Sequence, residues 1–73
     1  MKTTIGRIVI FYVPEDMKPK VNFADQLPAM IVRAWSDDCV NLKIITDGLE
    51  DIWQTSVVKG NDPNNWNWPV IEK

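Results

Sequence analysis

The apolar residues of this chain fall in short runs that are rich in β-branched and aromatic side chains and that end in turn-forming residues. Residues 5–13 consist mostly of Ile, Val, Phe and Tyr, and Pro14 ends the run. Further runs of this kind lie at 29–35, 39–46, 52–58 and 66–71. No stretch repeats its apolar residues at the spacing of a helix face over helical length. Runs of this length and composition are typical of β-strands, so we predict an all-β protein.

The runs at 29–35 and 39–46 predict a hairpin, because Ser-Asp-Asp at 36–38 is turn chemistry between two strand-like flanks. A three-residue loop makes one face wholly apolar by pairing Ala34 with Val40, Val32 with Leu42 and Met30 with Ile44. The other face then carries Trp35, Arg33, Ile31, Asn41, Lys43 and Ile45. A two-residue loop would mix polar and apolar positions on both faces, which a buried face does not tolerate. We therefore predict the three-residue loop.

Residues 14–28 are expected to form one long loop after the first strand, because their three prolines leave room only for a short turn at 23–27. Along 52–58, strand alternation would put Trp53, Thr55 and Val57 on one face. Pro69 confines the last strand to a sheet edge or a bulge. The predicted fold is one domain over 1–73, a small and strongly bent antiparallel sheet or barrel of the SH3-like type with four or five strands.

Charge and composition exclude several kinds of partner. The net charge of −2 and the pI of about 4.8 disfavour nucleic-acid binding, which rests on a basic surface. With one cysteine and no histidine, the chain lacks the clustered ligands of the usual zinc sites, and an intramolecular disulfide is impossible. No signal-peptide region is present, and no apolar run reaches the roughly 18 residues of a membrane span. We expect a cytoplasmic protein without a membrane partner and with Cys39 reduced.

Catalytic chemistry is not indicated by the sequence. Histidine, the usual general acid or base, is missing, and nothing adjacent to Cys39 would activate its thiol. The acidic pairs at 15–16, 37–38 and 50–51 fall in predicted loops, where carboxylates are usually solvated or cap turns. We therefore predict a protein that is not an enzyme and that needs no cofactor or metal.

Arg33 lies in the middle of an apolar strand, where a charge must face solvent, pair or bind an anion because burying it alone is costly. The predicted register places it beside Asn41, with Lys43 and Trp35 nearby. A guanidinium, an amide, an ammonium and an indole on one sheet face could hold a phosphate and stack on a planar group. The commoner role of such an arginine is structural, stacked on Trp35 or paired across a subunit interface.

Three of the four tryptophans crowd the last third of the chain, and the two-residue spacing of Trp66 and Trp68 puts both indoles on one face of an extended segment. A chain of this size has little interior for four indoles. At least one is expected to plug the barrel end, and the others to line an interface or pocket of a homo-oligomer. The candidate ligand-binding residues are Arg33, Trp35, Asn41, Lys43, Trp53, Thr55, Asn65, Trp66 and Trp68.

The chain resembles a group of small, mostly uncharacterised proteins encoded by bacteriophages and prophages. The shared motifs are Pro-Ala at 28–29 with Trp35, Val-Asn-Leu at 40–42, Thr-Asp-Gly at 46–48, Trp-x-Thr-Ser-Val at 53–57 and Trp-x-Trp-Pro at 66–69. They cover nearly all of the chain after the first loop. Leu27 stands where the group's pattern has arginine, which weakens any anion-binding role at that position.

The resemblance implies a phage accessory protein, and compact oligomeric β proteins of phages include anti-defence sponges that sequester nucleotide signals of host immunity. We therefore expect a homo-oligomer that holds a small anionic ligand, such as a signalling nucleotide, in pockets between subunits. The alternative is an SH3-like adaptor whose aromatic groove binds a peptide segment of a host or phage protein. Fold alone does not choose between these functions.

Overall fold

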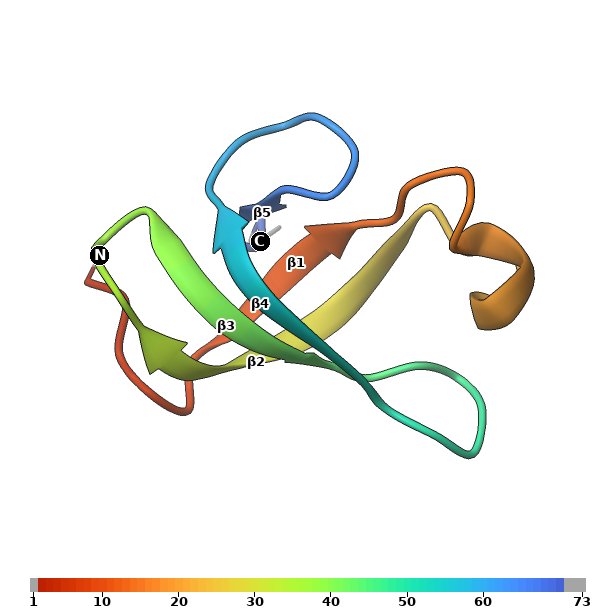
Figure 1. Cartoon of the computed structure of the whole chain (residues 1–73), viewed down its shortest axis with the longest axis horizontal. Helices are drawn as coiled ribbons and strands as arrows, with labels where there is room; N and C mark the ends of the chain where they lie inside the picture. The colour runs from red at the N-terminus through yellow and green to blue at the C-terminus, as the bar shows by residue number, and fades with distance from the viewer. Residues whose placement is uncertain (1, 71–73) are drawn as a thin grey trace.

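The computed structural model describes residues 2–70, which form one curled antiparallel sheet and a short 3-10 helix (Figure 1). The elements in chain order are β1 (Ile8–Tyr12), η1 (Lys18–Val21), β2 (Gln26–Ala34), β3 (Cys39–Ile44), β4 (Ile52–Val58) and β5 (Trp66–Asn67). The order in the sheet is β4-β3-β2-β1-β5. The sheet curls so far that Lys59, just after β4, bridges to Trp66 in β5. The prediction of an all-β, strongly bent antiparallel sheet is confirmed, and the arrangement is compatible with an SH3-like barrel.

The concave inner face of the sheet holds the core. Its fully buried side chains come from alternate positions of β1, β2 and β3, as strand geometry requires. They include Val9, Phe11, Ala29, Ile31, Val40, Leu42 and Ile44, and Trp66 from β5 joins them. Full burial of a side chain such as Leu42 contributes about 1.5–3 kcal/mol to folding. No helix among residues 2–70 is long and apolar enough to cross a membrane.

The loop of the β2–β3 hairpin is the predicted one. Ala34 pairs with Val40, and the backbone N–H of Trp35 donates to the carbonyl of Cys39 at 2.9 Å, which leaves 36–38 as the loop. The Ser36 hydroxyl accepts the backbone N–H groups of two residues that follow it, at 3.2 and 3.1 Å. This local bonding is the turn chemistry that the sequence indicated.

The register further along this hairpin differs from the prediction because β2 contains a bulge. Ile31 pairs with Leu42 in place of Val32, and Met30 pairs with Lys43. An extra residue in one strand moves every side chain before it to the opposite face. Met30 and Val32, predicted to be in the apolar core face, are therefore partly exposed, whereas Ile31, predicted on the polar face, is fully buried.

A second bulge lies in β4, where Thr55 and Ser56 together oppose a single residue of β3. Ser56 has φ of 54°, in the left-handed region that residues other than glycine rarely adopt. The bulge resets the alternation, so that Trp53 is 57% exposed whereas Val57 is 3% exposed. The prediction that Trp53, Thr55 and Val57 share a face is wrong for this reason.

The loop after β1 is shorter than the predicted 14–28. It contains η1, and β2 begins at Gln26, so Pro28 lies inside a strand. The carbonyl of Pro28 accepts the N–H of Ile45 at 2.9 Å, one residue beyond the end of β3. The N–H that proline lacks would face Ile45, at the very end of the β2–β3 pairing, so only a terminal ladder bond is lost and the strand tolerates the proline.

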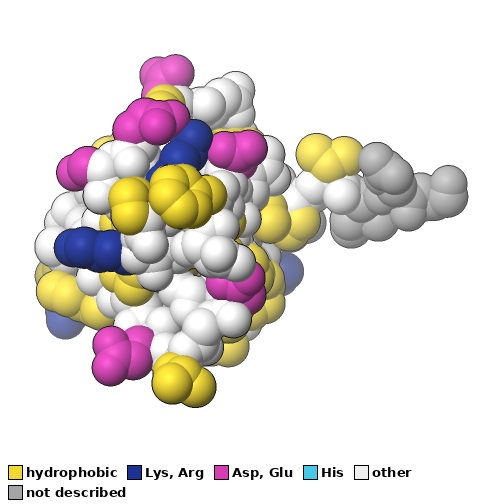
Figure 2. Space-filling model, turned by 90° about the vertical axis from the view of Figure 1, so that its right-hand side faces the viewer, with side chains coloured by type: hydrophobic (Ala, Val, Ile, Leu, Met, Phe, Trp, Pro, Cys, Tyr) yellow, Lys and Arg dark blue, Asp and Glu magenta, His cyan; other side chains and the backbone are white. Residues whose placement is uncertain are grey.

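Lys18, at the start of η1, forms ion pairs with residues at both ends of this loop. Its ammonium lies 2.7 Å from a carboxylate oxygen of Glu15 and 3.0 Å from one of Asp25. The hydrogen bond to Glu15, followed by that to Asp25, raises the pKa of Lys18 above its ordinary value. Figure 2 shows this end of the molecule, where basic, acidic and apolar side chains are interspersed and no single kind dominates.

Candidate functional site

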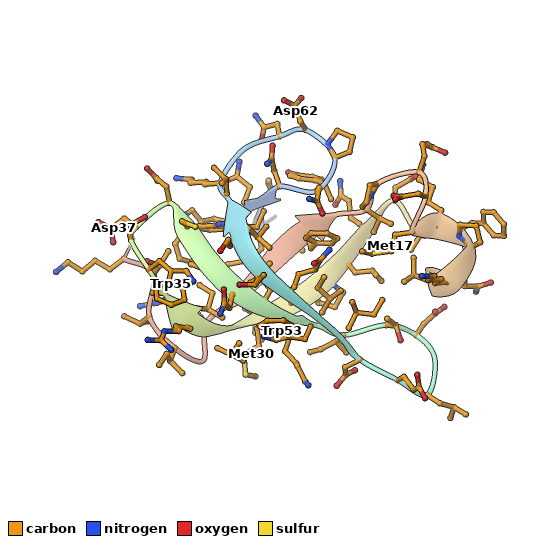
Figure 3. The ribbon with its side chains drawn as sticks, in the orientation of Figure 1. Met17, Met30, Trp35, Asp37, Trp53 and Asp62 are labelled. Atoms are coloured by element: carbon orange, nitrogen blue, oxygen red, sulfur yellow. The ribbon has the colours of Figure 1, made fainter. Side chains whose placement is uncertain are left out.

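Six of the predicted ligand-binding residues meet on the outer face of β2, β3 and β4, the face turned away from the core. The pairs Arg33–Asn41 and Lys43–Trp53 are direct neighbours across strands, and opposite residues share a face. Figure 3 labels Trp53 and Met30 at the lower side of the sheet, and Trp35 further along, toward the β2–β3 hairpin. The outer-face site consists of Arg33, Trp35, Asn41, Lys43, Trp53 and Thr55.

Asn41 is the centre of the outer-face site. Its side-chain oxygen Oδ1 accepts hydrogen bonds from the indole Nε1 of Trp35, the hydroxyl of Thr55 and the backbone N–H of Ser56, each at 2.9 Å. The bulge in β4 brings Thr55 and Ser56 over Asn41, and Trp35 reaches it from the end of the β2–β3 hairpin, so that Asn41 is only 7% exposed. Because a buried amide must be hydrogen-bonded, this arrangement fixes the position of Asn41 and of the Trp35 ring together.

Arg33 stacks on the ring that Asn41 holds. Its Cζ atom lies 4.2 Å from the centre of the Trp35 ring, within the range of a cation–π interaction. Among residues 2–70 the ion pairs within 4.0 Å are those of Lys18, and neither Arg33 nor Lys43 has a carboxylate partner. The outer-face site therefore presents two positive charges that are free to meet an anion.

Beside the two cations, the outer face carries an apolar row that crosses four strands. Ile8 pairs with Met30, Met30 with Lys43, and Lys43 with Trp53. Each of the three apolar members is more than a third exposed. Exposed apolar side chains gathered in this way, here on both sides of one ammonium, are typical of a binding surface. The β2 bulge turns Met30 to the outer face and so places it in this row, and no feature of the sequence marks that bulge.

Trp66 and Trp68 lie apart from the outer-face site, at the closing edge of the sheet. Trp66 is fully buried, and its Nε1 donates to the carbonyls of Asp38 and Val57, both at 3.1 Å. Trp68 is half-buried and meets Trp66 edge-on, with ring centres 5.3 Å apart and planes at 89°. The prediction that one indole plugs the end of the barrel is confirmed, and the buried Trp66 ring has no surface on which a ligand could stack.

Asn65 also lies at this closing edge, where its polar groups hold the loop between β4 and β5. Its carbonyl accepts the N–H of Tyr12 at 2.9 Å, and its Oδ1 accepts the N–H of Asp62 at 3.1 Å. A Cβ at Gly60 would come within 2.6 Å of the same Oδ1, so a larger residue there would displace the Asn65 side chain. The structure thus places Asn65, Trp66 and Trp68 together, but away from the bonding network around Asn41.

Ser56 is the residue of the outer-face site that the sequence did not indicate. It contributes a backbone N–H and not a side chain, and that N–H reaches Asn41 only because of the left-handed φ at the β4 bulge. The described residues contain no group of three side chains placed to hold a metal ion, and no pocket is found in the isolated chain over 2–70. Comparison of the chain with family models, curated proteins and solved structures finds no match.

Proposed function

We propose that this chain is a phage-derived, non-enzymatic binding protein that acts in the bacterial cytoplasm. As a homo-oligomer it sequesters a small anionic ligand with a planar group, such as a signalling nucleotide of host immunity. The observation that carries this proposal is the pair of cations without carboxylate partners, Arg33 and Lys43, beside the exposed indoles of Trp35 and Trp53. Unpaired cations beside aromatic faces are the combination that recognises a phosphate joined to a base.

Each group of the site has a separate part in binding. The Arg33 guanidinium offers a planar fork of donors to phosphate oxygens, and Lys43 adds a mobile point charge. Trp53, directly beside Lys43, offers an indole face to the base, where stacking contributes about 1–3 kcal/mol per base. Asn41 has its oxygen occupied by three donors and serves to position Trp35 under Arg33. Binding therefore requires no proton transfer and no covalent step.

Titration of purified protein with a panel of mono-, di- and cyclic nucleotides tests this proposal, with isothermal calorimetry as the readout. We expect Arg33→Ala and Lys43→Ala each to weaken binding of the preferred nucleotide at least tenfold. Lys20→Ala is the matched control, because it removes an exposed lysine from η1 and leaves the outer face intact. Equal loss in the control would indicate a general charge effect, and no binding by the wild type would contradict the proposal.

The apolar row on the outer face favours a second candidate, an SH3-like adaptor that binds a segment of a host or phage protein. Ile8 and Met30 have no evident part in nucleotide binding, yet they continue the row from Trp53 across the sheet. Such an exposed apolar strip with flanking cations fits an extended peptide with acidic residues. Met30→Ser would weaken binding of a peptide and leave a nucleotide's affinity unchanged.

A further inference from the structure

The edge of the sheet at β4 is open over the first half of the strand. β4 is the last strand in the order β4-β3-β2-β1-β5, and among residues 2–70 its outer side meets β5 only near its C-terminal end, through the Lys59–Trp66 bridge. Residues 52–55 have β3 on one side and no strand on the other. We call this stretch the open edge.

The backbone groups exposed at the open edge follow from the alternation of the ladder. The N–H of Ile45 donates to Pro28, so Ile45 and Lys43 direct their peptide groups toward β2. Leu42 precedes Lys43, and Ile44 lies between Lys43 and Ile45. Both therefore direct their peptide groups toward β4, where Leu42 pairs with Gln54 and Ile44 pairs with Ile52. Trp53, which lies between these two partners, must direct its own N–H and C=O away from β3. Its peptide groups face the open edge.

The open edge carries no charge and no proline, two of the features that usually prevent strand pairing. Protected edges carry lysine, proline or an inward-pointing charge. β4 reads Ile-Trp-Gln-Thr-Ser-Val-Val, with no proline and no charged residue, and its first half is built from strand-forming side chains. The bulge at Ser56 limits the free length to the stretch around Trp53. Within that stretch the edge is suited to accept another strand.

We propose that two copies of this chain pair through their open edges, with β4 antiparallel to β4 and Trp53 opposite Trp53 of the partner subunit. A two-fold axis at this point makes the contact self-complementary, because each Trp53 both donates and accepts across it. Charge disfavours the parallel alternative, since the two carboxylates of Glu50 and Asp51 directly precede the strand. Parallel pairing in register would place these carboxylates beside their own copies, whereas antiparallel pairing with Trp53 at the axis places them opposite the uncharged Thr55 and Ser56 of the partner subunit.

The pairing would join two outer faces into one continuous surface. Trp53 and its cross-strand neighbour Lys43 would then lie beside Trp53 of the partner subunit, so that a ligand stacked on one indole is within reach of both chains. This inference deepens the proposed function and rests on it for the statement that the chain is a homo-oligomer. The pairing itself involves no ligand and is testable in its absence.

Disulfide trapping tests the pairing directly. Trp53→Cys in a Cys39→Ser background places one thiol at the proposed axis, and hydrogen-bonded antiparallel partners have Cα atoms about 5.5 Å apart, a separation that suits a disulfide. Val32→Cys in the same background is the matched control, because Val32 is also exposed but lies on β2 and away from the edge. With added oxidant, we expect covalent dimers at least five times faster from Trp53→Cys than from the control. Equal rates would overturn the proposal.

Hydrogen exchange on the unaltered chain gives a second measurement that does not depend on a variant folding. Raising the protein concentration from about 1 µM to about 1 mM should slow exchange of the Trp53 amide at least tenfold. The exposed Gly48 amide, bonded to Thr46 in the loop after β3, is the internal control and should not change. No change at Trp53 while the protein sediments as an oligomer would overturn edge pairing and leave the ligand proposal standing. Slowed exchange at Trp53 without nucleotide binding would support edge pairing and contradict the ligand proposal.

Discussion

The side-chain oxygen of Asn41 accepts the indole N–H of Trp35 at 2.9 Å, across a hairpin whose register is shifted by a bulge. The same oxygen accepts two further donors from the bulge in β4. One amide therefore holds both the bulge in β4 and the ring on which Arg33 stacks. This relationship links the stability of the sheet to the geometry of the outer-face site.

Asn41→Ala should destabilise the fold and disturb the site together. Three donors lose their shared acceptor, and at about 1 kcal/mol for each hydrogen bond we expect a loss of about 2–3 kcal/mol in the free energy of unfolding. Urea denaturation measures this loss. Asn61→Ala is the control, because Asn61 is exposed and makes a single side-chain hydrogen bond, to Asn67. Equal effects in both variants would show that Asn41 is not the centre of the network.

Ser56 should be replaceable by glycine at a gain in stability. Its φ of 54° is unfavourable for a residue with a Cβ, whereas glycine adopts it without strain. Ser56→Gly keeps the backbone N–H that bonds Asn41 and should raise the free energy of unfolding by about 0.5–1 kcal/mol. Ser56→Val should lower it by more than 1 kcal/mol, since β-branched residues tolerate this region least. Thermal melts of both variants check the signs, and a stabilising valine would contradict the bulge geometry.

Trp66 and Trp68 should differ sharply when replaced. Trp66→Ala empties a fully buried site and orphans two carbonyls, for an expected cost of about 3–5 kcal/mol. Trp68→Ala removes a half-buried ring and one edge-on contact, so its cost should be about 1–2 kcal/mol. Chemical denaturation of the two variants under the same conditions makes the comparison. Equal and large losses would mean that both indoles belong to the core.

Arg33→Ala should leave the fold nearly unchanged. Arg33 is exposed, and its stacking on Trp35 contributes about 0.5–1 kcal/mol at an exposed site. The melting temperature should therefore fall by no more than a few degrees, while binding of an anionic ligand is weakened. Differential scanning calorimetry measures the first effect. Unfolding of the variant would show that Arg33 is structural and would remove it from the binding site.

The strands and the first hairpin loop could be predicted because they depend on local chemistry. β-Branched runs and the Ser-Asp-Asp turn at 36–38 act within a few residues, and the pairing of Ala34 with Val40 follows from the loop length. The same loop length also pairs Arg33 with Asn41, without any long-range contact. That part of the candidate site was therefore accessible from the sequence.

The bulges could not be predicted, because they depend on contacts between strands. Nothing in the local sequence says that Ser56 adopts a left-handed φ, and the reason emerges only when Asn41 is seen to accept its N–H. The bulge in β2 exposes Met30, which was predicted on the core face. The bulge in β4 separates Trp53 from Val57, which were predicted to share a face. The apolar row of the outer face is a consequence of these tertiary contacts.

Native mass spectrometry of protein purified from cells tests most directly whether this chain binds an anionic ligand as an oligomer. One spectrum reports the number of subunits and any small molecule that they retain. We predict a dimer or higher oligomer with a bound anion in the wild type, and the same oligomer without the anion for Arg33→Ala combined with Lys43→Ala. A bare monomer from the wild type, or a double variant that retains the ligand, would contradict the account.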